Sequence, residues 1–221
     1  MLKFELVQTD KHSTNNLLRR KNLRFLRRAN LIKLVVLHTD LNLNMNENII
    51  FIGGIHGVGK GTLCKKLSEK YSLKHLSASE VLKWNEISTK YNKKVKNFES
   101  TQTRLISGLK KIITRNETYL LDGHFCLLNK NGNPEKISEE TFLKIRPKAI
   151  IVMTEDIDVI IDRLKGRDDS KYNYNTLSKM QDLELNYSKE ISLKLKVPHI
   201  NIVNGDYSFF SKFLKSYENI N

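Results

Sequence analysis

From residue 49 onward, the chain alternates between short apolar runs and longer segments in which apolar residues recur every three or four positions. The apolar runs lie at residues 49–52, 118–121, 149–153 and 197–203. They are rich in Ile, Leu and Val, which predicts strands buried on both faces, and the periodic segments between them predict amphipathic helices. Strands that alternate with helices are typical of a parallel sheet. We therefore expect an α/β fold with a doubly wound, mostly parallel sheet in three layers.

The pattern also makes local predictions. Leu105, Leu109 and Ile112 recur at helical spacing and predict the buried side of one helix. Ser77, followed three positions later by a glutamate, predicts a capping box at the start of a short helix. Asn131-Gly132 lies between two apolar segments, which predicts a tight turn and a β-hairpin insertion.

Glycine is concentrated directly after the first predicted strand, where residues 53–62 read Gly-Gly-Ile-His-Gly-Val-Gly-Lys-Gly-Thr. Gly54 and Gly59-Lys60 have the G-x-x-x-x-G-K spacing of a phosphate-binding loop. Glycines let successive backbone N–H groups face the phosphates, and the following helix presents its N-terminus to the same anion. The alternative is a glycine turn without a ligand. The flanking strand, helix and lysine favour a nucleotide-phosphate site, formed by Gly54, His56, Gly57, Val58, Gly59, Lys60, Gly61 and Thr62.

The residue after the lysine is Gly61, and the hydroxyl comes one position later, at Thr62. Phosphate-binding loops more commonly have Ser or Thr directly after the lysine. The Gly-Lys-Gly-Thr variant resembles the adenylate kinase branch of the nucleoside monophosphate kinases. The loop is also similar to that of short-lid, adenylate kinase-like proteins with a Gly-x-His-Gly-x-Gly-Lys sequence that are described as ATP-binding. This resemblance covers roughly residues 47–203 and implies a P-loop nucleotide kinase fold that uses ATP and Mg²⁺.

The second apolar run ends in Asp122-Gly123, which places a carboxylate at the carboxyl edge of the sheet, where ligands bind in open α/β folds. Asp122 can hold Mg²⁺ through its water shell, with the hydroxyl of Thr62 as a second oxygen ligand. The alternative is that Asp122 only caps a turn. Leu-Leu-Asp-Gly resembles an adenylate kinase stretch, but His124-Phe-Cys stands where Phe-Pro-Arg follows in that family. His124 either replaces that arginine as a donor to an anion or satisfies a turn.

Arg163 and Arg167 lie four positions apart and share one face at the end of a predicted helix. By the same resemblance they lie at the base of the lid, where guanidinium groups neutralise charge on the transferred phosphoryl group. The alternative is an ion pair with Asp162, Asp168 or Asp169. The lid is expected to be short, because only about residues 166–175 separate this helix from the next.

The acceptor side carries weaker motifs. Residues 73–83 resemble the adenylate kinase motif His-Ile-Ser-Thr-Gly-Asp-x-Leu-Arg, with Ser77 retained and Lys83 in place of the arginine. The resemblance implies that Ser77 and Lys83 contact the acceptor, although lysine cannot hold a phosphate bidentately. Gln102 and Arg104 begin a helix that lines the acceptor site in that family. We expect Gln102 to contact the substrate and Arg104 to be exposed.

The composition fits one domain with a sizeable core in a chain of 221 residues. Cys64 and Cys126 fit no metal-binding spacing and imply no disulfide framework, and Cys64 falls on the apolar side of its helix. No apolar run is long enough to span a bilayer, and we expect a cytoplasmic protein.

Residues 1–44 form a basic leader that contributes +6 to the net charge of +14. They contain no glycine or proline, and their Arg-rich run could be an organellar transit peptide, a membrane-surface helix or a nucleic-acid-binding arm. We expect instead a flexible leader or an upstream extension, with the P-loop domain over residues 45–221.

These motifs predict an ATP-dependent phosphotransferase whose small acceptor is, by resemblance, a nucleoside monophosphate. Lys60, Arg163, Arg167 and Asp122 would act by positioning and charge neutralisation. One alternative is an ATP-binding regulatory or partner protein with little turnover, which the missing acceptor arginine favours. Another is a nucleic-acid-associated NTPase or polynucleotide kinase, which the basic segment favours although no nucleic-acid-binding motif is present.

Overall fold

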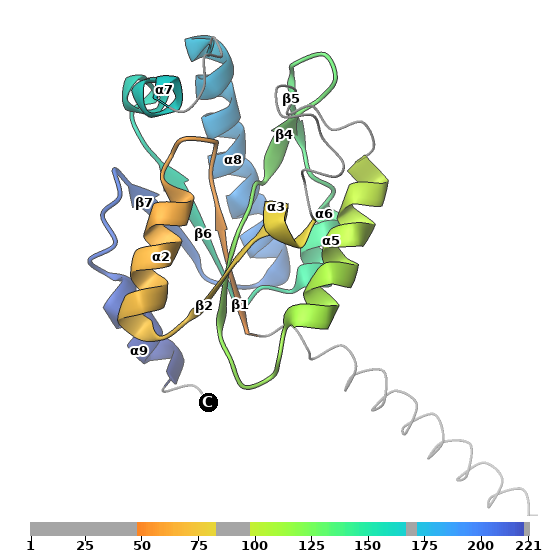
Figure 1. Cartoon of the computed structure of the whole chain (residues 1–221), viewed down its shortest axis with the longest axis vertical. Helices are drawn as coiled ribbons and strands as arrows, with labels where there is room; N and C mark the ends of the chain where they lie inside the picture. Colours follow the sequence, from red (N-terminus) through yellow and green to blue (C-terminus); the bar gives the residue numbers. More distant parts are fainter. Residues whose placement is uncertain (1–47, 83–97, 167–171, 219–221) are drawn as a thin grey trace, which may run out of the picture. The chain divides into compact units, whose positions relative to one another are not determined.

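A computed structural model of the chain describes residues 48–82, 98–166 and 172–218 (Figure 1). Five strands form one parallel sheet: β1 (Ile49–Gly53), β2 (Lys74–Ser77), β3 (Tyr119–Asp122), β6 (Ala149–Thr154) and β7 (His199–Val203). Their order across the sheet is β2-β3-β1-β6-β7. β1 is therefore the central strand, and the loop that follows it leaves the middle of the sheet at its carboxyl edge.

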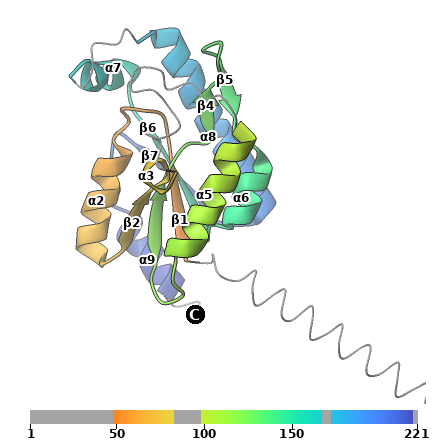
Figure 2. The same cartoon turned by 45° about the vertical axis from the view of Figure 1, so that its right-hand side comes forward.

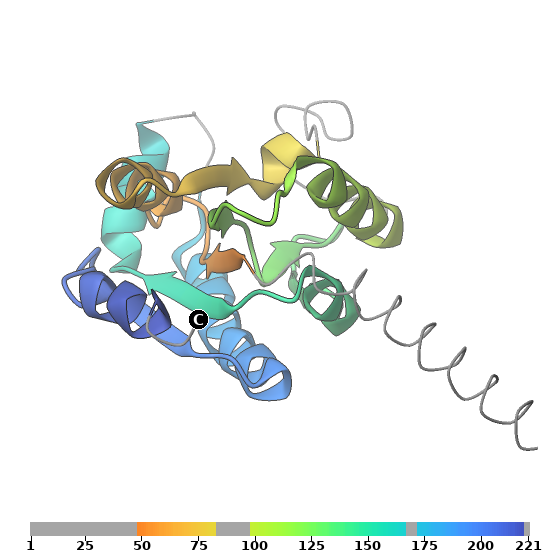
Figure 3. The same cartoon turned by 90° about the horizontal axis from the view of Figure 1, so that it is seen from below.

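Helices cover both faces of this sheet (Figure 3). They are α2 (Lys60–Tyr71), α3 (Ala78–Val81), α5 (Phe98–Ile112), α6 (Glu139–Ile145), α7 (Ile157–Lys165), α8 (Tyr174–Leu195) and α9 (Phe210–Glu218). Alternate residues of β1 point to opposite faces, as a strand requires. Ile50 and Ile52 pack with buried residues of α2, α7 and α9, whereas Ile49 and Phe51 pack with those of α5 and α6. The predicted three-layer, doubly wound α/β fold is confirmed.

The predicted β-hairpin is also confirmed. β4 (Cys126–Leu128) and β5 (Pro134–Lys136) pair antiparallel, and Gly132 adopts a φ of +80° in the turn between them. The hairpin stands apart from the main sheet and lies beside α8 (Figure 2). The connection from α7 to α8 runs from Lys165 to Tyr174 and is short, as predicted.

Two local predictions are wrong. Ile112 is 42% exposed, and Ile113 is buried in its place on the side of α5 formed by Leu105, Ile106 and Leu109. At 100° per residue, Ile106 moves the centre of the buried stripe away from Ile112 and toward Ile113. Ser77 is the N-cap of α3, but its side chain makes no capping hydrogen bond, because the Ser77 hydroxyl lies 2.8 Å from that of Ser79.

Several predictions fall outside the described residues. These are the basic leader over residues 1–44, Lys83 and Arg167. Among the helices of the described part, none is both long enough and apolar enough to cross a membrane.

Candidate functional site

The connection from β1 to α2 is a glycine loop in a conformation that other residues would not adopt. Gly54, Gly57 and Gly59 have φ values of +140°, +82° and +104°. A Cβ at Gly54 would lie 2.8 Å from the carbonyl oxygen of Met153, and a Cβ at Gly57 would lie 2.8 Å from the side chain of Leu164. At Gly54 and Gly57, glycine is required because φ is positive and because there is no room for a Cβ atom. The loop is thus held tightly against β6 and α7.

The loop ends at the start of α2, where Gly59 is the N-cap and provides no side-chain hydrogen bond to the helix. The first N–H groups of a helix need partners from outside it and attract anions. Lys60 is the first residue of this helix and is only 8% exposed. Its ammonium group donates to the carbonyl oxygens of Gly54, at 2.7 Å, and Ile55, at 3.1 Å. The backbone N–H groups at the start of α2 and the Lys60 ammonium group therefore lie close together at the end of the glycine loop.

A cavity of about 430 Å³ opens at this point. At one end it is lined by loop and α2 residues, including Gly57, Gly59, Lys60, Gly61 and Thr62. Asp122 and His124 line the same cavity, as do the predicted acceptor residues Ser77 and Gln102. The structure therefore brings together, from four separate parts of the chain, most of the residues that the sequence predicts for the donor and acceptor sites. Arg104 is exposed, as expected, and donates to the carbonyl oxygen of Leu82 at 3.2 Å.

The part of the lining that comes from α5 and α6, on the opposite face of the sheet from α2, is largely apolar, and we call it the far end of the cavity. Phe51, Leu105, Phe142 and Ile145 line it together with Leu127 and Ile137, which lie in and just after the hairpin. The rings of Phe51 and Phe142 meet edge to face, with their centroids 5.4 Å apart. This arrangement offers a flat, apolar body a binding surface and leaves the polar end of a ligand near the glycine loop.

Asp122 is oriented by a histidine. β3 pairs with β1 so that Asp122 lies opposite Ile52, directly beside the start of the loop. The Asp122 carboxylate accepts a hydrogen bond from His75 of β2, with 2.6 Å between Oδ2 and Nε2. Asp122 thus presents a fixed carboxylate to the cavity rather than capping a turn.

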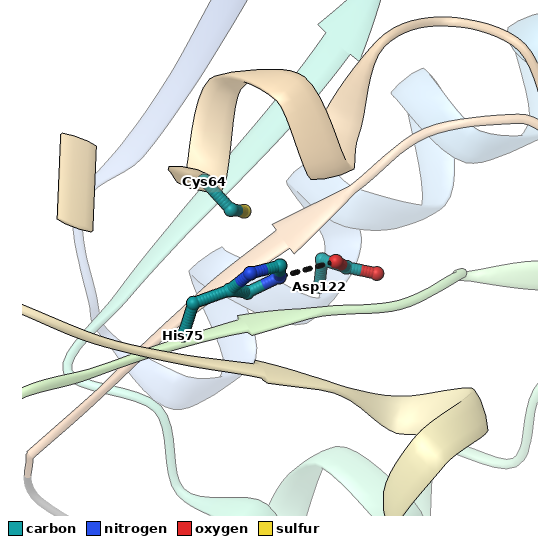
Figure 4. A group of neighbouring side chains, drawn as sticks. All are labelled: Cys64, His75 and Asp122. Carbon is teal, nitrogen blue, oxygen red and sulfur yellow. Dashed lines mark hydrogen bonds and ion pairs between the residues drawn. The ribbon is translucent and has the colours of Figure 1, made fainter. Parts of the chain in front are cut away.

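Cys64 lies close to this pair, and the donor atoms of Cys64, His75 and Asp122 are within 4.8 Å of one another (Figure 4). Two ligands of one tetrahedral zinc ion would be roughly 3.3 Å apart, given bonds of about 2.0 Å. The 2.6 Å between His75 and Asp122 is instead the length of a hydrogen bond. Burial raises the pKa of the Cys64 thiol, and Cys64 packs in the core as the sequence predicts.

His124 lies against the glycine loop. Its ring and that of His56 have centroids 4.2 Å apart, and its Nδ1 is 3.5 Å from Oε1 of Glu184. Both histidines line the cavity. His124 thus lies beside His56 of the glycine loop, and its role as a donor to a bound anion stays a prediction.

Arg163 of α7 also reaches the loop. Its guanidinium donates to the carbonyl oxygen of Val58 at 3.3 Å and pairs with Glu155 at 2.8 Å. The alternative of an ion pair with Asp162 is not observed, because Asp162 pairs with Lys165 at 3.3 Å, and Asp168 and Asp169 lie outside the described residues. Glu155 is held by Gln181 of α8 through its backbone N–H and carbonyl groups, which fixes the position of the arginine's partner.

The family model described as AAA domain (AAA_17) matches residues 53–181, a range that includes the glycine loop, Asp122 and Arg163. The chain belongs to this family.

Relatives of this AAA domain protein are adenylate kinases. The adenylate kinase of Mesomycoplasma hyopneumoniae (strain 232) is 33% identical over 122 residues, which are 48% of this chain and 56% of that protein. The putative adenylate kinase of Methanocaldococcus jannaschii is 28% identical over 128 residues, or 53% of this chain and 72% of that protein. The chain therefore spans little more than half the length of the first of these relatives. The resemblance to the adenylate kinase-like P-loop proteins is confirmed.

A solved gluconokinase from Sinorhizobium meliloti 1021 aligns with 73% of this AAA domain protein and 85% of its own chain. The TM-score is 0.47 at 10% sequence identity, which is too low to support an argument about function.

Two site residues of this AAA domain protein were not predicted from its sequence. His75 lies within residues 73–83, yet nothing in the neighbouring sequence shows that its ring reaches Asp122. Glu184 interrupts the apolar stripe of the segment over residues 176–195, which was the one available signal. In the structure Glu184 is completely buried and accepts hydrogen bonds from the glycine loop and from the start of β4.

Proposed function

We propose that this P-loop kinase-family protein transfers the γ-phosphate of Mg-ATP to a small acceptor held in the cavity. The observation that carries the proposal is the continuity of this cavity. Lys60, Thr62 and Asp122 line the same space as Ser77 and Gln102. A donor phosphate on the loop and an acceptor at the far end would therefore face each other, and holding two reactants in line is the main source of catalysis in phosphoryl transfer.

Each polar group at the loop has a role in this proposal. The backbone N–H groups and the Lys60 ammonium would bind the donor phosphates, and Arg163, which contacts the loop at Val58, would neutralise charge on the transferred group. Thr62 and Asp122 offer oxygen ligands at one end of the cavity, which suits Mg²⁺. Bound Mg²⁺ would supply charge neutralisation at the phosphate oxygens.

The acceptor we infer is a nucleoside monophosphate. The aromatic and aliphatic wall formed by Phe51, Leu105 and Phe142 suits a flat base, and Gln102 can hydrogen-bond to the edge of that base. A polyol would leave its hydroxyl groups unpaired against this wall. The adenylate kinase relatives support the same class of acceptor.

A second candidate function is nucleotide-dependent regulation with little turnover. Among the described residues that line the cavity, Lys60 is the only lysine or arginine. Guanidinium groups hold phosphates bidentately, so their absence from this lining favours weak binding of an acceptor phosphate. A nucleic-acid-associated NTPase remains a prediction that draws only on residues 1–44.

The test is ADP formation from Mg-ATP by the full 221-residue chain with AMP, CMP, GMP or UMP, and with gluconate as a polyol control. We expect one monophosphate to raise ADP formation by roughly tenfold or more over the basal rate, since it supplies a positioned acceptor. A flat panel despite tight Mg-ATP binding would favour the regulatory function. Stimulation by RNA that weakens steeply with salt would favour the nucleic-acid function.

His75 provides a separate test of the role of Asp122. We expect His75→Leu to reduce turnover by roughly 10-fold to 100-fold, the usual cost of losing a residue that orients a metal-associated carboxylate. His75→Gln keeps a donor and should retain most of the activity. Turnover is measured while Mg²⁺ is varied, and a wild-type rate for His75→Leu would contradict the role.

A further inference from the structure

Glu184 is a charged residue in an unusual place. It lies in the middle of α8, is 0% exposed and belongs to neither of the two apolar clusters. Burying a carboxylate is costly unless it is fully hydrogen-bonded. Glu184 meets this requirement with backbone N–H groups from two distant parts of the chain.

The first partner is the glycine loop. The N–H of Gly54 donates to Oε2 of Glu184 at 3.0 Å, and the carbonyl oxygen of Gly54 accepts from the Lys60 ammonium at 2.7 Å. Gly54 is thus held from both sides, by an anion at its N–H and by a cation at its carbonyl. Since a side chain at Gly54 would clash with Met153, the loop has little freedom to move elsewhere. Glu184 therefore affects the position of Lys60 through one residue.

The second partner is the start of the hairpin. The N–H of Phe125 lies 3.0 Å from both carboxylate oxygens, and the N–H of Cys126 donates to Oε1 at 3.1 Å. The hairpin that begins here contributes Leu127 to the apolar end of the cavity. One carboxylate thus joins the donor loop to the wall of the acceptor end.

We propose that Glu184 is a positioning residue that fixes the glycine loop against the β3–β4 connection and so sets the affinity of the loop for nucleotide. This inference rests on the proposed function, because it concerns the same phosphate site. A carboxylate is needed because both of its oxygens accept from N–H groups. An amide or a protonated carboxyl group carries a hydrogen-bond donor of its own, which would face these N–H groups without an acceptor between them.

The charge state of Glu184 makes the proposal testable, because it predicts how nucleotide affinity changes with pH. Burial raises the pKa of Glu184 to about 7, while the positive charge of Lys60 and the N–H groups of Phe125 and Cys126 oppose the rise. The titratable groups that face the carboxylate are His124, the Cys126 thiol, whose raised pKa keeps it neutral, and Lys60. His124 in turn contacts His56. Below about pH 7 the carboxylate gains a proton and the loop loses its acceptor, so nucleotide affinity should fall.

Stability should change in the opposite direction. The pKa of Glu184 rises from 4.5 to about 7 on folding, so the folded state binds the proton more tightly than the unfolded state. The contribution of this group to stability is greatest below pH 4.5, decreases as the pH rises to about 7, and is constant above that value. If Glu184 had only a structural role, its loss of a proton at higher pH would lower stability without raising the affinity for nucleotide.

The test measures the affinity for a non-hydrolysable Mg-ATP analogue from pH 6 to pH 8 by calorimetry, with melting temperatures, on the full chain. The variants are Glu184→Gln, Glu184→Asp and the control Ser188→Ala. Ser188 is also completely buried in α8, one turn further on, but it bonds to Leu185 and His199 instead of the loop. Wild type and Ser188→Ala share any effect of pH on the nucleotide itself.

We expect Glu184→Gln to bind on the order of tenfold more weakly than wild type at pH 8, because one loop N–H loses its acceptor. We also expect it to lack the fall in affinity of up to about tenfold that wild type and Ser188→Ala show at pH 6. Glu184→Asp, which keeps the charge, should keep the fall. Wild-type affinity in Glu184→Gln, or an unchanged pH dependence, would overturn the inference. Absence of binding in folded wild type would overturn the proposed function as well.

Discussion

Replacing Lys60 with methionine should reduce ADP formation by roughly 100-fold to 1,000-fold, as removal of one preorganised electrostatic donor does in other enzymes. The reason lies in the position and contacts of the Lys60 ammonium group. Lys60 places the only ammonium of the described cavity lining at the start of α2, where its Nζ contacts two loop carbonyl oxygens. Methionine has a similar length and keeps the apolar stem, so the fold should survive.

The matched control is Lys65→Met, which removes an exposed lysine from the same helix. Turnover and melting temperature are compared at saturating Mg-ATP, and Lys65→Met should behave as wild type. Because the positive charge of Lys60 lowers the pKa of Glu184, Lys60→Met should also raise that pKa further above its ordinary range. Equal turnover in Lys60→Met and Lys65→Met would refute the assignment of the glycine loop as the phosphate site.

Changing Asp122 to asparagine should reduce turnover by about 100-fold and increase the Mg²⁺ concentration needed for half-maximal rate. Asparagine preserves the shape and can keep a hydrogen bond to His75, so the lost quantity is the negative charge that faces the cavity. The charge matters because a water-coordinated Mg²⁺ is held chiefly by carboxylates.

Asp182→Asn, at an exposed position of α8, is the control for loss of one negative charge. Turnover is followed over a Mg²⁺ titration for both variants. The role of Asp122 predicts that excess Mg²⁺ partly restores the asparagine variant. A Mg²⁺ dependence identical to that of wild type would exclude Asp122 from the metal site.

The sequence predicted those parts of the site that depend on residues close together in the chain. The glycine loop needs only consecutive residues between a strand and a helix, and Asp122 follows from the end of an apolar run. The carboxyl ends of parallel strands lie at the same edge of the sheet, so β1 and β3 bring the glycine loop and Asp122 together. The hairpin was predicted for the same reason, from the turn at Asn131-Gly132.

The remaining parts depend on contacts between distant residues. The apolar pattern around Glu184 carried no information on the N–H groups of Gly54 and Phe125, which lie 130 and 59 positions away from it. The alternative for Arg163 was an ion pair with a neighbouring aspartate, but its partner is Glu155, which precedes α7 and is fixed by Gln181. Such pairings are decided by how the helices pack on the sheet, and spacing along one helix cannot show them.

We propose above all that the γ-phosphate of ATP is transferred to an acceptor bound at the far end of the cavity. The most direct measurement follows γ-labelled Mg-ATP with the full chain and each nucleoside monophosphate, and separates labelled nucleotide from inorganic phosphate. We expect the label to appear on one nucleoside monophosphate, and we expect Lys60→Met to reduce this transfer by roughly 100-fold to 1,000-fold. Label found only in inorganic phosphate, with no acceptor labelled, would contradict the proposed transfer.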